Sequence, residues 1–355
     1  MKQTRAVPIN RAILWLFVAA VAWFLVHRFG QIEQTTNTLL AGSWLWIVIA
    51  AALQAVYYVC LTSLSSIAFR VVGIARSVRE LLPLVLGSLI INVLAPTGGI
   101  AGASLFMQDA HARKESVTKA GSGSLLTLLV VYSSFVPVLV VGLAVLVLQH
   151  EIKLYQILGA LFLGVLILSI YLLFRLATQR ESVLRHLLRG IDRIAHAIAW
   201  TLRRPPLLDA HWIDTAMKEL AETGAASRAQ PALVQRAFEF GLAGYLVNIL
   251  SLAAIFVAFH QPLDMNVILA GYAISSLFWI VAPAPQGVGI EEAIMSVIFT
   301  SLGLPVTQSI AIAIAFRGVN FWLPLLVGIG LFVRHQRQRS TTVASHSPAQ
   351  LRTRA

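Results

Sequence analysis

The sequence predicts an all-α polytopic membrane protein with about six full transmembrane helices and two re-entrant hairpins of broken helices. The 355 residues are 58% hydrophobic and 12% charged, whereas a soluble domain carries about 25% charged residues. The mean hydropathy is +0.79, and the apolar residues fall in runs of the length that a bilayer requires. Two of these runs are interrupted by proline and glycine. This pattern excludes a soluble enzyme, a disordered chain and a coiled coil.

Eight apolar units follow one another along the chain. They are Ala12–Phe29, Ser43–Ala68, Glu80–Asp109, Ala120–Leu148, Leu154–Leu176, Ala237–Phe259, Met265–Leu302 and Thr307–Val333. The third unit contains Ala95-Pro96-Thr97-Gly98-Gly99, and the seventh contains a Pro/Gly-rich run from Ala282 to Gly289. Because proline removes a backbone donor and glycine loosens a helix, each of these two units is expected to split into two half-helices.

The distribution of Lys and Arg residues along the chain predicts that both broken units return to the side from which they enter. On that assumption six units cross the cell (inner) membrane, and both termini are cytoplasmic. Nearly all of the 27 Lys and Arg residues then lie inside, as the positive-inside rule expects. Arg28 and Lys153 fall outside, and Arg317 falls within the membrane. Two tight full crossings in each broken unit would preserve the same sidedness, so this alternative stays open.

An inverted repeat follows from this topology. The units from Ser43 to Leu148 and those from Ala237 to Val333 form two triplets of opposite orientation, each with a broken unit in its middle. Both broken tips are expected near the bilayer midplane, an arrangement typical of transporters. The prediction rests on topology and on the position of the helix breakers, without a clear residue-by-residue repeat. Residues 1–335 are therefore assigned to one transmembrane domain.

Residues 178–236 form the long polar stretch of the chain and are expected on the cytoplasmic side of the same domain. Apolar residues recur at helical spacing from Leu184 to Ile198, with arginines on the other faces. This predicts a basic amphipathic helix on anionic inner-leaflet lipids, or a cytosolic helix packed on loops. Gly224–Ser227 is interpreted as a flexible link, and residues 336–355 as a disordered cytoplasmic tail.

Three charged residues are the first candidates for a binding site. Arg317 lies near the middle of the last apolar unit, and Glu291 and Glu292 directly follow the second helix break. Charges inside the membrane are costly and usually functional. We expect Arg317 to receive a phosphate or carboxylate, while a glutamate orients the arginine or receives a cation. The alternative is a buried Arg–Glu pair that fixes the helix packing.

The two helix breaks supply further candidates. Half-helices that begin near Gly99 and Val288 would expose backbone N–H groups that attract anions. A head group could approach the backbone closely at four glycines, and three side chains could line a hydrophilic path, although ordinary helix breaking and interhelical hydrogen bonding are the alternatives. These residues are Gly98, Gly99, Gly287, Gly289, Asn92, Asn320 and Gln286. For Asn248, an interhelical hydrogen bond is the favoured interpretation.

The sequence lacks the motifs that metal binding, nucleotide binding and hydrolysis usually require. It lacks an H-x-x-H or H-E-x-x-H pattern, a P-loop and a G-x-S-x-G elbow. We therefore expect no cofactor, no metal, no ATP hydrolysis and no enzymatic activity. The net charge of +12 is ascribed to topology and lipid contact, so no nucleic-acid partner is expected.

Three motifs in order resemble the lysylphosphatidylglycerol synthase transmembrane region family, a family of flippase-like membrane proteins. The first runs from Asn92 through Pro96, Gly98 and Gly99 to Gly102, and the second is Pro285-Gln-Gly287-Val-Gly289-Ile-Glu291. The third is Ala315-Phe-Arg317, followed by Phe321-Trp-Leu-Pro324 and Gly328. The resemblance covers roughly residues 10 to 335. The sequence departs from many members, because it has Ile100-Ala-Gly-Ala-Ser104 where they place a charged residue. This departure argues against recognition of a charged head group by the first hairpin.

This resemblance implies an ATP-independent translocase of membrane phospholipids. The lipid would be aminoacylated phosphatidylglycerol or a related anionic or polyprenyl lipid. The soluble aminoacyl-transferase domain of the two-domain synthases is not expected here. Two other functions remain open: a proton-coupled carrier of a small solute, and a non-transporting partner of a lipid-modifying enzyme, docked through residues 178–236. Gly159 and Gly164 offer a small-residue surface for helix contact, and a homo-oligomer stays open, although their spacing is not the G-x-x-x-G dimer motif.

Overall fold

The computed structural model describes residues 42–94, 101–179, 182, 212–281 and 289–330, and within these ranges every regular element is a helix. Five helices are long and apolar enough to cross a membrane. They are α3 (Trp44–Val71), α6 (Val117–Leu148), α7 (Leu154–Gln179), α10 (Pro231–Ala258) and a last span, Val306–Gly330. The prediction of a polytopic α-helical membrane protein is confirmed. The unit Ala12–Phe29, the proposed helix Leu184–Ile198 and the tail 336–355 lie outside the described residues.

Each of the two broken units forms two helices, which lie on either side of the predicted break. The first forms α4 (Val78–Leu94) and α5 (Ala103–Ala112), and the second forms α11 (Met265–Val281) and α12 (Ile290–Ser301). At 1.5 Å per residue, α4 and α11 are each about 25 Å long, and α5 and α12 are about 15 and 18 Å long. Each half-helix is therefore shorter than the hydrocarbon core of about 30 Å.

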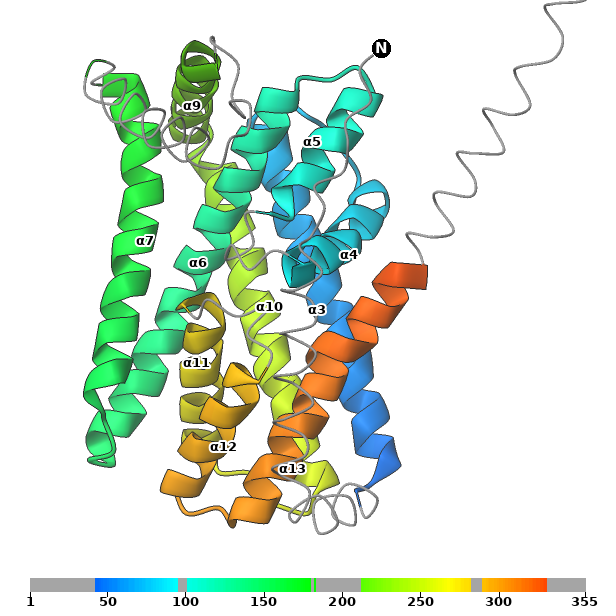
Figure 1. Ribbon diagram of the computed structural model, residues 1–355, viewed down its shortest axis with the longest axis vertical. Coiled ribbons are helices and arrows are strands. Elements are labelled where there is room, and N and C mark those ends of the chain that lie inside the picture. Colours follow the sequence, from blue (N-terminus) through cyan, green and yellow to red (C-terminus); the bar gives the residue numbers. More distant parts are fainter. Residues whose placement is uncertain (1–41, 95–100, 180–181, 183–211, 282–288, 331–355) are drawn as a thin grey trace, which may run out of the picture.

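The half-helices are too short to cross the membrane, and contacts at their ends show that both units return to the side of entry, so both are re-entrant hairpins. Arg76, just before α4, forms ion pairs with Asp109 at the end of α5 and with Glu115 beyond it. At the second hairpin, the rings of Phe256 near the end of α10 and Phe299 near the end of α12 lie 5.1 Å apart, centroid to centroid. Each hairpin thus enters and leaves on one side, and Figure 1 shows the two hairpins at opposite ends of the molecule.

The helix lengths support the inverted repeat. Helices α3 and α10 both have 28 residues, and α4 and α11 both have 17. Two residues beyond α3, α10, α5 and α12, the backbone has a positive φ in each case, at Gly73, His260, Lys114 and Gly303. The backbone N–H of Ser43, at the start of α3, donates to the carbonyl of Ala258, at the end of α10, over 2.8 Å. The leading helices of the two halves, α3 and α10, therefore run antiparallel and pack against each other (Figure 1).

A buried polar cluster joins α3 and α10. The Gln54 amide donates to Asn248 and, over 3.3 Å, to the Ser251 hydroxyl, and Ser251 in turn donates to the carbonyl of Ala50 over 3.1 Å. Side-chain hydrogen bonds across helices in a membrane contribute about 0.6 kcal/mol on average. The interpretation of Asn248 as an interhelical hydrogen-bonding residue is confirmed.

Close helix packing at Gly142 leads to a prediction about stability. A Cβ atom added at Gly142 of α6 would collide with the Cβ of Ala273 in α11, whereas one added at Gly164 of α7 meets no atom within 4 Å. Overpacking a core costs about 1–3 kcal/mol. We expect Gly142→Ala to lower the thermal stability in detergent, and Gly164→Ala to leave it unchanged or raise it slightly. Equal stability of the two variants would contradict the packing described here.

The predicted flexible link at Gly224–Ser227 is wrong. These residues lie inside α9 (Trp212–Ala229), which packs against α7 and α6. Met217, Leu220 and Thr223 are buried on its inner side. A single glycine inside a helix costs about 1 kcal/mol relative to alanine, and the burial of this apolar side offsets that cost.

Candidate functional site

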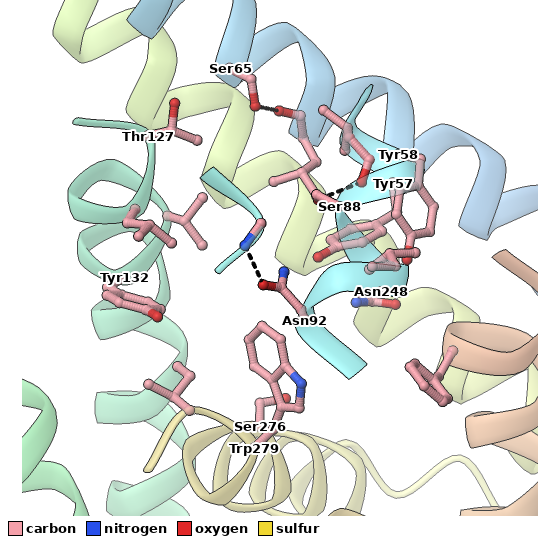
Figure 2. A pocket seen from close by; sticks show the side chains of 18 of the residues that line it. Tyr57, Tyr58, Ser65, Ser88, Asn92, Thr127, Tyr132, Asn248, Ser276 and Trp279 are labelled. Atoms are coloured by element: carbon pink, nitrogen blue, oxygen red, sulfur yellow. Dashed lines mark hydrogen bonds between the residues drawn. The ribbon is translucent and has the colours of Figure 1, made fainter. Parts of the chain in front are cut away.

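A cavity of about 180 Å³ lies at the centre of the molecule, between the two halves. Both hairpins, α3, α10, α6 and the last span contribute to its wall. It gathers four of the residues singled out in the sequence: Asn92 from the first hairpin, Glu291 from the second, and Arg317 and Asn320 from the last span. Figure 2 shows side chains from several helices turned toward this space.

Arg317 lies near the middle of the last span, as predicted, and it is engaged by two carboxylates. Its Nη1 atom forms a buried ion pair with Glu291, and its Nε atom lies 3.2 Å from Oε1 of Glu292. The guanidinium carbon also lies 4.3 Å from the centre of the Phe321 ring, a cation–π arrangement. Arg317 and Glu291 are 4% and 3% exposed, so the pair is removed from water.

A π-helical turn follows Arg317 directly. Helix α13 (Val306–Arg317) changes into η2 (Gly318–Trp322), after which the α-helix resumes. Asn320 and Phe321 lie in this turn and line the cavity together with Arg317. Single π-turns inside α-helices occur frequently at functional sites.

The N-terminus of α12 is closed by its own glutamate. Gly289 is the N-cap with φ +84°, a conformation that favours glycine. Its backbone N–H donates to Oε2 of Glu292 over 2.7 Å. The positive end of this helix therefore already faces the carboxylates of Glu291 and Glu292 in its first turn. An incoming anion would have to compete with them.

The wall of the first hairpin is organised around Asn92. The backbone N–H of Gly102 donates to Oδ1 of Asn92 over 2.7 Å (Figure 2). A Cβ atom at Gly102 would lie 2.9 Å from Nδ2 of Asn92 and 3.0 Å from Cβ of Ser88. Glycine is required here for this close approach. The Nδ2 amide of Asn92 is the donor that this side chain can offer to a ligand.

Sequence reasoning missed the aromatic lining of the cavity. Its hydroxyl-bearing and indole side chains come from α3, α6, α10 and α11, and they include Tyr57, Tyr58, Tyr132, Tyr245, Tyr272 and Trp279. Amphipathic rings of this kind combine apolar contact area with a hydrogen-bonding tip. The adjacent pair Tyr57-Tyr58 in the middle of an apolar run is the signal that could have pointed to them.

Four predicted site residues lie outside the described part of the chain. They belong to the tips of the hairpins and are Gly98, Gly99, Gln286 and Gly287. The structure therefore neither supports nor contradicts a role for them.

A second charge cluster closes the base of the first hairpin, away from the cavity. Arg76 bridges Asp109 and Glu115, and Nε of Arg113 lies 3.0 Å from Oδ2 of Asp109. Burial alone would lower the pKa of the Arg76 guanidinium, but its hydrogen bonds to Glu115 and Asp109 raise that pKa above its ordinary value. This cluster holds α4 and α5 together at their open end.

The family model described as the lysylphosphatidylglycerol synthase TM region matches residues 12–328. The chain belongs to this family. Membership indicates a function connected with membrane lipids. A UPF0104 membrane protein of Methanothermobacter thermautotrophicus is similar to this family member, with 22% identity over 319 residues, which are 88% of this chain and 91% of the relative. No solved structure matches the chain significantly.

Proposed function

We propose that this member of the family is an ATP-independent translocase that moves phospholipids between the two leaflets. The observation that carries the proposal is the central cavity, which brings Asn92, Glu291, Arg317 and Asn320 together from two oppositely oriented hairpins and the last span. Midplane sites at the interface of inverted repeats are typical of transporters. The family adds the connection to membrane lipids.

The size of the cavity suits a head group. Its volume of about 180 Å³ corresponds to about six water molecules at roughly 30 Å³ each. The acyl chains would stay in the bilayer, along the apolar surface that the spans expose at residues such as Leu161, Phe162 and Leu326. In this scheme the phosphate meets Arg317 and the Asn92 amide donates to a head-group oxygen.

The charge distribution supports a proposal for the membrane in which the protein lies and for its orientation. We place the protein in the cell (inner) membrane with both termini in the cytoplasm, because this orientation puts nearly all Lys and Arg residues inside. The basic stretch 178–236 would then face anionic inner-leaflet lipids. We assign the chain no enzymatic activity of its own.

The test is lipid translocation in proteoliposomes that contain only the purified protein. Phosphatidylglycerol with a fluorescent head-group label is placed in both leaflets, and a membrane-impermeant quencher reports the fraction accessible from outside. We expect the protein to make the inner-leaflet lipid accessible, while liposomes without protein stay half-quenched.

Two other results would favour the alternatives. Uptake of a water-soluble solute without lipid movement would favour a small-solute carrier. Translocation that requires an added lipid-modifying enzyme would favour a role as the partner of that enzyme. A folded protein that moves no lipid class on its own would contradict the proposal.

A further inference from the structure

The charges around Arg317 do not balance. One guanidinium, Arg317, faces two carboxylates, Glu291 and Glu292. No second cationic side chain is found among the described residues that line the cavity. The other titratable groups in its wall are tyrosines, namely Tyr57, Tyr58, Tyr132, Tyr245 and Tyr272. An uncompensated carboxylate in a low-dielectric interior is costly and favours the uptake of a proton.

The two carboxylates are held differently. Glu292 accepts the backbone N–H of Gly289 over 2.7 Å, and its side chain is 19% exposed. Glu292 therefore keeps a backbone hydrogen-bond donor when Arg317 is engaged elsewhere. Glu291 is 3% exposed and its carboxylate is compensated by Arg317. The Glu291 carboxylate therefore loses its counter-charge when Arg317 binds another anion.

We propose that each anionic head group that binds in the cavity is accompanied by one proton, which is carried by Glu291. The phosphate and Glu291 compete for Arg317. When the phosphate binds, the Glu291 carboxylate loses its counter-charge and takes up one proton from the aqueous phase on the side from which the lipid enters. When the lipid leaves, the Glu291–Arg317 ion pair re-forms and the proton is released. The negative charge of the lipid and one proton thus enter the cavity together and leave it together, so the net charge of the cavity stays constant.

This inference rests on the proposed function but makes a separate prediction about binding. If one proton is taken up with each head group, the affinity falls about tenfold for each unit rise in pH, over the range in which unliganded Glu291 is ionised. The phosphodiester keeps its single negative charge over that range, so it does not contribute to the slope. The tyrosines listed above face the same space but are neutral near pH 7.

The experiment measures the dissociation constant of dihexanoyl phosphatidylglycerol for the full-length protein in detergent at several pH values between 6 and 9. For the wild type we expect log Kd to rise with a slope of about one per pH unit. Glu291→Gln should bind the lipid with a slope near zero, because glutamine cannot exchange a proton. Glu239→Gln, a change at an exposed glutamate of α10, should keep the wild-type slope.

Lipid translocation under a pH gradient provides a second measurement. In proteoliposomes with an imposed pH gradient, the wild type should translocate lipid faster along the proton gradient than against it. Glu291→Gln should lose this difference. Wild-type binding with zero slope, together with translocation that ignores the gradient, would overturn the proton coupling and leave the translocase intact. Absence of both binding and translocation in folded wild-type protein would overturn the proposed function and the coupling together.

Discussion

Arg317→Ala is expected to reduce lipid translocation by tenfold to a hundredfold or more. A charge-assisted hydrogen bond contributes about 1.5–3 kcal/mol, and each 1.4 kcal/mol is about a factor of ten. Arg317 is the cation in the described wall of the cavity, so its loss removes the counter-charge for a phosphate. The measurement is the translocation rate in proteoliposomes. Arg70→Ala, at an exposed arginine in the last turn of α3, is the matched control and should keep the wild-type rate.

The same substitution also affects stability, and a double variant separates the two effects. Removing one partner of a buried ion pair costs about 3–5 kcal/mol, because the other charge is left uncompensated. Adding Glu291→Gln to Arg317→Ala removes one of these buried charges and should restore much of the thermal stability. It should not restore translocation. A stable double variant that translocates lipid at the wild-type rate would contradict the role of Arg317.

Arg76→Ala is expected to produce the largest loss of stability outside the membrane interior, about 3 kcal/mol. The substitution leaves Asp109, which is 5% exposed, without the arginine that compensates its charge. The estimate lies at the low end of the range because Arg113 also contacts Asp109 and because Glu115 is 36% exposed. Thermal unfolding in detergent measures the effect.

Arg79→Ala serves as the control for Arg76→Ala, because Arg79 is exposed on the first turn of α4. It should change the unfolding temperature little. If the two variants unfold at the same temperature, the ion-pair cluster does not hold the hairpin closed.

Much of the architecture was predictable because bilayer physics restricts the sequence strongly. Apolar runs and Pro/Gly breaks predicted the spans and the points at which α4 and α11 end. The cost of an intramembrane charge predicted that Arg317 needs a partner, and Glu291 was among the residues named. Sidedness from positive charges predicted that both broken units return to the side of entry, but the lengths of α5 and α12, which are too short to cross a bilayer, were needed to distinguish re-entry from two full crossings.

The remaining features depend on tertiary packing and could not be derived from local pattern. The tyrosines of the cavity resemble ordinary apolar positions in sequence, and the bundle alone decides which helix faces turn inward. The need for glycine at Gly102 becomes visible once Asn92 is seen to pack against it. The helical state of Gly224–Ser227 arises because α9 buries one side against α7, a contact that local propensity does not encode.

The most direct test of the account is photo-crosslinking with a phosphatidylglycerol that carries a diazirine on its head group. After illumination of the full-length protein in nanodiscs, mass spectrometry maps the labelled residues. We predict labelling of residues that line the cavity, such as Asn92, Tyr272 and Phe321, and loss of this labelling in the presence of excess unlabelled lipid. Labels confined to the outer surface of the spans, for example along α7, would contradict a head-group site between the hairpins.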